Sequence, residues 1–235
     1  RVLRVRCAGA PGTADLPHHN SNAERTDTPM KKHTVTIARQ YGSRGREIGH
    51  CLADALGCKY YDRDLISMAA EKSGYNKDVL SEADEKAANS LLYTLALGSS
   101  VYAHGFDQVN VPLNDKLFIV QSDIIREIYE SGDGAVIVGR CADYVLAGRD
   151  DVAHIFITAD FDARVATVAK RNGIPESKAK DLVIKTDKRR ANYYNYYTGN
   201  KWGTVDGYDL IINSEETGIN GAVSVIRAFL DTDAD

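Results

Sequence analysis

The sequence predicts an α/β fold in which parallel strands form a sheet that helices cover on both faces. Two observations carry this prediction. Short apolar or β-branched runs, typical of buried strands, span residues 34–37, 135–138, 152–158 and 209–212, and residues 59–61 can form a further short strand. Stretches with helical periodicity separate them, among them residues 48–56, 116–130, 161–171 and 220–230. About five strands alternating with helices favour a parallel sheet with right-handed crossovers.

Composition indicates an ordinary globular protein and excludes several classes. The chain has 235 residues, of which 43% are hydrophobic and 26% charged, with a net charge of -4. This acidity argues against a general nucleic-acid-binding protein, which is usually basic. No apolar run is long enough to span a bilayer, and the four cysteines lack metal-ligand spacing and are interpreted as reduced thiols. We therefore expect a cytoplasmic protein with neither a nucleic-acid nor a membrane partner, and the oligomeric state stays open.

Residues 1–29 differ from the rest of the chain. They lack periodicity, and their basic start is followed by no apolar segment, so a secretory signal is not indicated. A mitochondrial presequence is the alternative, but acidic residues such as Asp15 and Glu24 argue against it. Met30 stands just before the first predicted strand. We therefore predict a non-native or disordered extension over residues 1–29 and a single domain over residues 30–235.

A glycine-containing loop links the first predicted strand to the first helix. Strand, glycine loop and helix form the context of a phosphate-binding loop, whose backbone N–H groups and helix N-terminus favour an anion. The standard pattern is G-x-x-x-x-G-K-[ST]. Here Arg46 replaces the lysine and Glu47 the Ser or Thr, and only Gly45 matches by position. The nucleotide-binding residues expected in this loop are Gly42, Ser43, Arg44, Gly45, Arg46 and Glu47.

Two positions of the loop leave alternatives open. Arg46 can pair with phosphate bidentately, where a lysine acts as a point charge. Glu47 stands where the standard motif supplies a hydroxyl to Mg²⁺. Its carboxylate could hold the metal directly or through water, or it could simply favour the helix start. An ordinary turn with basic residues facing solvent is the competing interpretation of the whole loop.

Charged and polar residues follow the predicted strands where each strand ends. Ligands of parallel sheets bind beyond the carboxyl ends of the strands, so residues at these ends are expected to meet. In strand order they are Ser43, Arg44 and Arg46; Asp62, Arg63 and Asp64; Arg140; Asp160; and Asn213. Cations and carboxylates on one rim are the pattern of a phosphate and metal site, although any surface rim carries some charge.

Four segments of the chain show a resemblance to the cytidylate kinase-like family, a group with the nucleoside monophosphate kinase fold. They are residues 36–48 (TIARQYGSRGREI), 60–66 (YYDRDLI), 138–142 (VGRCA) and 187–194 (DKRRANYY). The resemblance runs from residue 30 to the C-terminal helix and implies a three-layer P-loop kinase fold. It also implies a helical acceptor-binding insert over about residues 62–113 and a lid over about residues 174–207. ATP and Mg²⁺ are the implied cofactors, with a nucleoside monophosphate as acceptor.

The resemblance also implies roles for individual residues. Arg46 and the loop amides would hold the donor phosphates, and Arg189 or Arg190 would close from the lid onto the transferring group. Mg²⁺ would be oriented by Asp62 or Asp160, with Glu47. The substrate-binding positions of the family fall on Asp62, Arg63, Arg140, Asp187 and Arg190. The catalytic set implied is Arg46, Arg140, Arg189, Arg190 and Asp62.

Two classes of function remain open. One is ATP-dependent phosphoryl transfer to a small phosphorylated acceptor, with CMP as the first candidate and a different small molecule as a variant. The other is a nucleotide-binding sensor or interaction protein that keeps the fold without turnover. Departures from the family pattern keep the second class open: Glu47 in the loop, and Cys141 where true cytidylate kinases usually have Asp. Without the resemblance, the charge run around Arg189 and Arg190 is interpreted as a solvated helix face.

Overall fold

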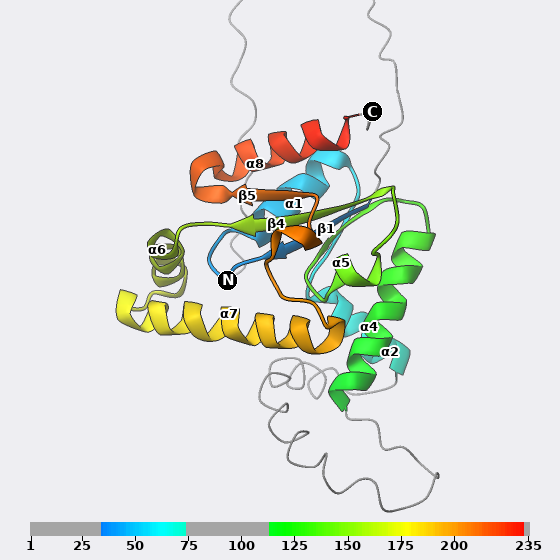
Figure 1. Cartoon of the computed structure of the whole chain (residues 1–235), viewed down its shortest axis with the longest axis horizontal. Helices are drawn as coiled ribbons and strands as arrows, with labels where there is room; N and C mark the ends of the chain where they lie inside the picture. The colour runs from blue at the N-terminus through cyan, green and yellow to red at the C-terminus, as the bar shows by residue number, and fades with distance from the viewer. Residues whose placement is uncertain (1–33, 74–112, 233–235) are drawn as a thin grey trace, which may run out of the picture.

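One parallel sheet forms the centre of the protein. The computed structural model describes residues 34–73 and 113–232. Within them the strands are β1 (Thr34–Arg39), β2 (Lys59–Tyr61), β3 (Ala135–Val138), β4 (Val152–Thr158) and β5 (Leu210–Asn213). They lie in the order β2-β3-β1-β4-β5, and every neighbouring pair is parallel. Figure 1 shows β1, β4 and β5 side by side in this sheet. The predicted parallel sheet of about five strands is therefore confirmed.

The register brings the carboxyl ends of the central strands to one edge. Thr34, at the start of β1, pairs with Ala135 of β3 and with Val152 of β4, so the three strands start level. Just beyond β3, the backbone N–H of Gly139 donates to the carbonyl of Ile37 at 3.0 Å. The loops that follow these strands consequently emerge side by side, as the predicted meeting of charged residues requires.

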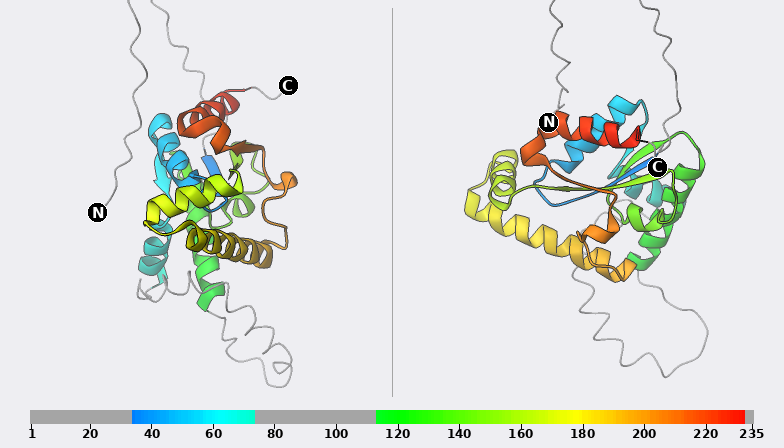
Figure 2. Two further views of the ribbon diagram at one scale, coloured as in Figure 1. Left: turned by 90° about the vertical axis from the view of Figure 1, so that its left-hand side faces the viewer. Right: turned by 45° about the horizontal axis from the view of Figure 1, so that its top comes forward.

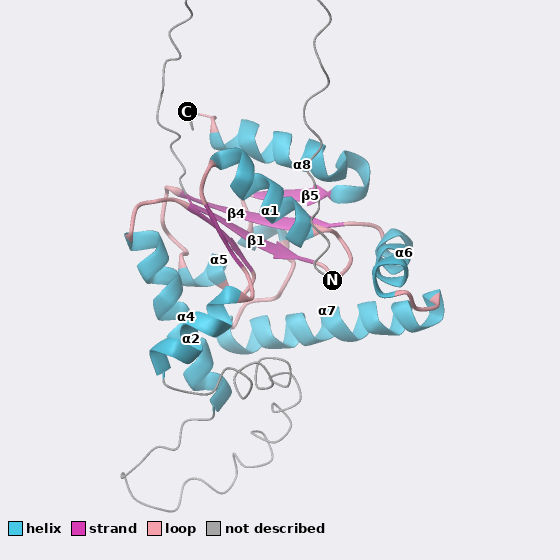
Figure 3. Cartoon of the chain, turned by 180° about the vertical axis from the view of Figure 1, so that it is seen from behind, coloured by secondary structure: helices cyan, strands magenta, loops and turns pink. Residues whose placement is uncertain are grey.

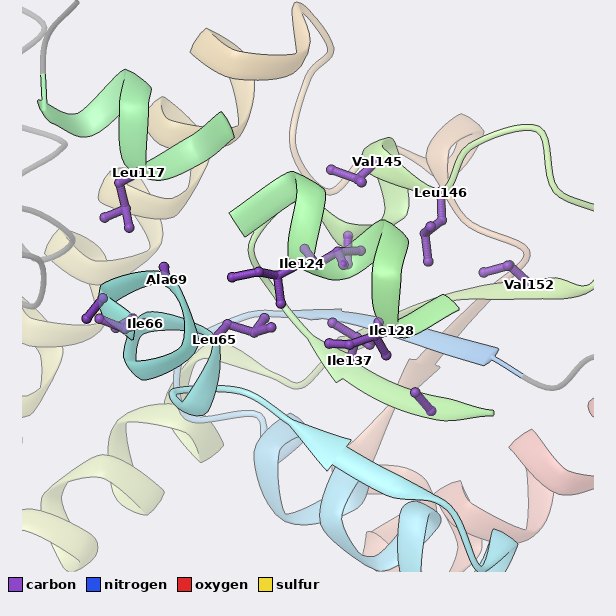
Figure 4. Packing of buried hydrophobic residues seen from close by; sticks show 14 residues of the cluster. Leu65, Ile66, Ala69, Leu117, Ile124, Ile128, Ile137, Val145, Leu146 and Val152 are labelled. Atoms are coloured by element: carbon purple, nitrogen blue, oxygen red, sulfur yellow. The ribbon is translucent and has the colours of Figure 1, made fainter. Parts of the chain in front are cut away.

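Helices cover the two faces of the sheet and complete three layers. They are α1 (Gly45–Leu56), α2 (Asp64–Ser73), α4 (Leu113–Glu130), α5 (Ala142–Val145), α6 (Phe161–Asn172), α7 (Glu176–Thr198) and α8 (Ser214–Leu230). On one face, α1 and α8 bury Ile48, Leu52 and Ile226 against the strands. On the other, α2, α4 and α5 bury a second apolar cluster that includes Leu65 and Ile124 (Figure 4). Figure 3 shows the two groups of helices on opposite sides of the strands.

Apolar periodicity and two special backbone positions set the limits of α1. Ile48, Cys51 and Leu52 are buried on one side of this helix. Arg44 precedes the helix in the left-handed conformation with φ 58°, and Gly57 follows it with φ 67°. Glycine adopts this conformation without the steric cost that other residues carry. The predicted helix is therefore confirmed, and it begins at Gly45.

Other helices also differ from the prediction. α4 begins at Leu113 rather than at residue 116. α8 begins at Ser214 rather than at residue 220, because the Asn213 side chain caps it by accepting the Glu215 N–H at 3.1 Å. A kink at Gly218, with φ 65°, separates this first turn from the predicted segment. The short helix α5 was not predicted, since it is too brief to carry a periodic pattern.

Some predictions concern residues outside the described part of the chain. The extension over residues 1–29 and most of the insert over residues 62–113 lie there. Among the described cysteines, Cys58 and Cys141 are free thiols, whereas Cys51 is disulfide-bonded. The prediction of reduced thiols is therefore wrong for Cys51. No described helix combines the length and the hydrophobicity that crossing a membrane requires.

A long helix, α7, runs past the carboxyl edge of the sheet. It packs on α6 through an apolar cluster that includes Val168 and Val183. Its far end reaches α4, where the rings of Phe118 and Tyr197 stack with centroids 4.2 Å apart. Both views in Figure 2 show α7 extending from α6 toward α4. The segment predicted as a lid, residues 174–207, therefore consists mainly of this helix.

Substitution of Gly49, a buried glycine of α1, tests how closely this helix packs on the sheet. A Cβ added at Gly49 would lie 2.9 Å from Cγ2 of Val138 and 3.2 Å from Cε2 of Tyr60. Gly49→Ala should therefore lower the free energy of unfolding by ~1 kcal/mol or more. The matched control is Gly221→Ala inside α8, where the nearest atom is Cβ of Thr217 at 3.4 Å. The control should be neutral or stabilising by up to ~1 kcal/mol. Equal changes in denaturant unfolding would contradict the close approach of α1 to β3.

Candidate functional site

The glycine loop between β1 and α1 is fixed by hydrogen bonds to its neighbours. The hydroxyl of the buried Ser43 donates to the carbonyls of Gln40 at 2.9 Å and Ile157 at 3.1 Å. Gly42 has φ +88°, and a Cβ there would lie 2.6 Å from the carbonyl oxygen of Arg164. The loop is therefore held against β4 and α6, and the Ser43 side chain serves the loop itself.

The N-terminus of α1 lies next to the glycine loop and favours the binding of an anion. Gly45 begins this helix, and Glu47 is the acidic residue in its first turn. Unpaired N–H groups and the helix dipole favour negative charge at such an end. A Cβ on Gly45 would lie 2.6 Å from Cβ of Arg39, so this glycine lets the helix start close to the last residue of β1. The backbone here has the form that the phosphate-loop prediction requires.

A buried carboxylate lies beside this helix start. Asp62 follows β2 and is only 5% exposed. Its Oδ2 accepts from Nε of Arg46 at 2.6 Å, and its Oδ1 lies 3.5 Å from Nη2 of Arg39. The ends of β1 and β2 and the first turn of α1 are joined through this one side chain. Two residues predicted as catalytic, Arg46 and Asp62, are thus brought into direct contact.

The turn after β3 adds a third arginine. Gly139, Arg140 and Cys141 have φ of 82°, 60° and 54°, so three consecutive residues are left-handed. Non-glycine residues adopt this conformation rarely and at some cost. A Cβ on Gly139 would overlap Nη1 of Arg39, so the turn passes directly over that guanidinium. Burial lowers the pKa of Arg140, and Arg39 and Asp62 are among the charges that act on it.

Helix α7 contributes a fourth arginine. Nη1 of Arg190 donates to the backbone carbonyl of Arg39 at 2.8 Å, and its guanidinium lies 5.4 Å from the centre of the Tyr41 ring. Burial lowers the pKa of Arg190 well below its ordinary value, and repulsion by Arg39 adds to the effect. Arg190 therefore ties α7 to the end of β1 at the same place where the other arginines meet.

A second ion pair fastens α7 to the glycine loop. Oδ1 of Asp187 accepts the backbone N–H of Tyr41 at 2.7 Å, and Oδ2 pairs with Nη1 of Arg164 at 2.5 Å. Nε of Arg164 also donates to the carbonyl of Ala159 at 3.0 Å. Both oxygens of Asp187 are engaged in holding the loop, so this residue has a clear structural task in addition to its predicted substrate contact.

Positive charge exceeds negative charge at this edge. Arg39, Arg46 and Arg140 all lie in the field of Asp62, and Arg190 approaches from α7. Burial lowers the pKa of Arg39, Arg140 and Arg190, and each is further lowered by repulsion from another arginine. Arginine stays protonated despite such shifts. A group with several negative charges is what this arrangement can stabilise.

Several other predicted residues are exposed to solvent. Arg44, Arg63 and Arg189 have exposed side chains. Asp160 is exposed at the start of α6, and its Oδ1 accepts from Nδ2 of Asn213 at 3.2 Å. Among the described residues, no three His, Cys, Asp or Glu side chains gather as a metal site. The structure therefore brings predicted phosphate-binding residues such as Arg46 and Arg140 to one place around Asp62. It does not gather the predicted metal ligands of the described chain into such a group.

Comparison with known proteins identifies the group to which this architecture belongs. The family model described as cytidylate kinase-like matches residues 34–216, which include the whole arginine cluster. The chain belongs to the cytidylate kinase-like family. Its parallel sheet, covering helices and glycine loop form the three-layer P-loop kinase fold of that family.

Individual relatives of the family are distant in sequence. A cytidylate kinase from Sulfurisphaera tokodaii is 23% identical over 198 residues, 84% of this chain and 94% of the relative. One from Methanocorpusculum labreanum is 29% identical over 103 residues, which span 44% of this chain and 57% of the relative. The crystal structure of an uncharacterized protein from Eubacterium ventriosum matches with a TM-score of 0.64 and 23% identity. That match covers 86% of this chain and 100% of the other, and it supports the fold alone.

Sequence reasoning missed three residues of this candidate site. Arg39 ends a buried strand, and a charge in that position was the available signal. Arg164 lies on the same face of α6 as Val165 and Val168, so a charged residue on an apolar face was a second signal. The role of Tyr41, whose ring faces Arg190 and whose N–H meets α7, depends on contacts that local sequence does not reveal.

The Asp187 ion pair can be tested by its effect on stability. Asp187→Ala leaves the buried Arg164 without its carboxylate, so the free energy of unfolding should fall by ~3 kcal/mol or more. Asp181→Ala, an exposed position on the same helix, is the control and should change stability by less than ~0.5 kcal/mol. Denaturant unfolding of both variants makes the comparison. Equal stabilities would mean that the pair does not fasten α7 to the loop.

Proposed function

We propose that this protein transfers a phosphoryl group from ATP to a small phosphorylated acceptor, with CMP as the first candidate. The observation that carries the proposal is the cluster of Arg39, Arg46, Arg140 and Arg190 beside the glycine loop, with Asp62 as its buried carboxylate. Phosphoryl transfer needs positioning and charge neutralisation more than covalent chemistry. Membership of the family supports the reaction class. The cytoplasmic location predicted from the sequence is part of this proposal.

The donor side uses the glycine loop. The amides at the start of α1 and the guanidinium of Arg46 would hold the phosphates of ATP. The Arg46 side chain is 44% exposed, so it can keep its contact with Asp62 and still reach a ligand from solvent. Gly42 and Gly45 carry no side chain that would block a phosphate from the loop backbone. Arg44 is exposed immediately before α1.

The acceptor side uses the turn after β3 and the lid helix. Arg140 would receive the acceptor phosphate, because its fork of donors suits a phosphate and its backbone is fixed by the sheet. Arg190 would neutralise charge on the transferring group from α7, with Arg189 as its exposed neighbour. Asp62 and Arg63 would line the entry from the insert. Closure of residues 174–207 over the substrates would exclude water.

Mg²⁺ fits this site as a companion of ATP. Mg²⁺ commonly binds through one or two carboxylates plus substrate phosphates, so a complete protein cage is not needed. Glu47 in the first turn of α1 is the carboxylate best placed for this, and Asp160 is the second candidate. The metal would neutralise phosphate charge when bound. The residues of the chain would align the two substrates.

Phosphorylation assays test this function. Wild-type protein with Mg²⁺ and ATP is incubated with CMP, UMP, AMP, GMP, dCMP and shikimate, and nucleotide products are separated by chromatography. We expect turnover with a nucleoside monophosphate, CMP foremost. ATP binding in calorimetry without any acceptor turnover would favour the sensor alternative. Turnover of a non-nucleotide acceptor alone would favour a kinase of a different small molecule.

A variant at Arg140 makes the test residue-specific. Arg140→Lys keeps a positive charge but loses the fork, and kcat/KM should fall at least ~10-fold, about 1.4 kcal/mol of transition-state stabilisation. The control is Arg149→Lys, since Arg149 stacks on Tyr129 away from this cluster. The control should transfer phosphate at the wild-type rate. If Arg140→Lys melts earlier yet retains full activity, Arg140 is structural.

A further inference from the structure

We propose that Arg39 binds the phosphoryl group in transfer and fills the place that a lysine holds in the standard glycine-loop motif. The inference rests on the proposed kinase function and adds a residue that the loop pattern does not contain. The Arg39 guanidinium is enclosed by the Asp62 carboxylate and by the turn at Gly139. The side chain of Arg39 is only 16% exposed, so most of it is removed from water.

The hydrogen-bonding capacity of Arg39 is largely unused. In the described part of the chain, its guanidinium makes one ion pair, with Asp62 at 3.5 Å, and no side-chain hydrogen bond. That separation is longer than an ordinary N–H···O bond of about 2.9 Å. A guanidinium carries five N–H donors, and a buried charged donor without an acceptor is costly. Oxygen atoms of a ligand would supply the missing acceptors.

The standard position for the cation is already engaged. Arg46 occupies the lysine position of the loop motif, but its Nε contacts Oδ2 of Asp62 at 2.6 Å. Asp62 therefore neutralises Arg46 first and Arg39 only weakly. Of these two arginines, Arg39 is therefore the one whose charge Asp62 compensates less. Repulsion by Arg46 also contributes to lowering the pKa of Arg39, after burial as the main cause.

The position of Arg39 suits the centre of the reaction. Gly45 of the donor loop and Gly139 of the acceptor turn both lack a side chain where Arg39 passes, and a Cβ at either position would collide with it. The Arg39 side chain thus passes the start of α1 with its aliphatic part and reaches the turn that carries Arg140 with its guanidinium. A group transferred from the loop toward Arg140 would pass this point.

A neighbouring hydroxyl points to the same conclusion. The hydroxyl of Tyr60 is buried and has no hydrogen-bond partner among the described residues. Burial raises its pKa, and the charges of Asp62, Arg46 and Arg39 act on it. Buried polar atoms are normally hydrogen-bonded. A second unused donor beside Arg39 is expected where a phosphate completes the site.

Paired variants separate a ligand role from a structural role. Arg39→Gln removes a buried charge with few partners, so the midpoint of thermal unfolding without ligand should stay within ~2 °C of wild type or rise. The matched control is Arg164→Gln, another buried arginine near this edge, whose Nε and Nη1 donate to the Asp187 carboxylate and to backbone carbonyls. The control should lower the midpoint by ~10 °C.

Binding and kinetics complete the experiment. Calorimetry with inorganic pyrophosphate and with Mg²⁺·ATP should give affinities at least ~10-fold weaker for Arg39→Gln than for wild type. With the best acceptor, kcat should fall by ~100-fold, more than KM rises. If Arg39→Gln fails to fold, Arg39→Lys is used in its place. We expect this variant to keep the wild-type melting midpoint and to lower kcat by ~10-fold.

The outcomes distinguish this inference from the kinase proposal. A variant that melts early like Arg164→Gln, yet binds pyrophosphate and turns over as wild type does, makes Arg39 structural and overturns the inference. Full activity of Arg39→Lys would overturn it as well. If the wild type transfers no phosphate, the kinase proposal fails. In that case a loss of pyrophosphate binding in Arg39→Gln still supports Arg39 as a phosphate ligand, and unchanged binding contradicts it.

Discussion

The arrangement of this protein depends on the burial of more arginine than carboxylate at the carboxyl edge of its sheet. Asp62 is the carboxylate that Arg39 and Arg46 share. Burying charge costs free energy unless partners compensate it. The loop, the turn after β3 and α7 all meet at this edge, so their positions are coupled to the same charges. Phosphate is the ligand that would complete the balance.

Glycines and backbone strain provide the space for this cluster. Gly45 and Gly139 allow α1 and the turn after β3 to close on the Arg39 side chain. Arg140 and Cys141 keep left-handed backbone conformations immediately afterwards. Such strain persists only where the surrounding structure holds it in place. Here the hydrogen bond from Gly139 to Ile37 and the packing of α5 provide that support.

Sequence reasoning predicted the central strands β1, β3 and β4 well because each is a run of mostly buried residues. Once parallel strands are accepted, residues after them must meet at one edge, and this brought Arg46, Asp62 and Arg140 together correctly. The start of α8 was harder to predict, because the kink at Gly218 separates its first turn, which Asn213 caps, from the segment with regular apolar spacing. Local patterns predict an element, while its ends depend on single hydrogen bonds.

The parts of the site that sequence reasoning missed depend on contacts between distant segments. Asp187 meets the N–H of Tyr41 across 146 positions, and Arg190 meets the carbonyl of Arg39 across 151. No periodicity or motif encodes such a pairing. The use of the Ser43 hydroxyl inside the loop is likewise a packing outcome, since Ile157 approaches it from another strand.

Thermal unfolding of the wild-type protein in different anions tests most directly whether the excess of arginines at the carboxyl edge of the sheet binds phosphate. Inorganic pyrophosphate is compared with acetate and chloride at matched ionic strength and pH 7. We predict that pyrophosphate raises the unfolding midpoint with saturation at a one-to-one complex, because a ligand that binds only the folded state stabilises it. Acetate and chloride should have little effect. Equal midpoints in all three salts would contradict the account.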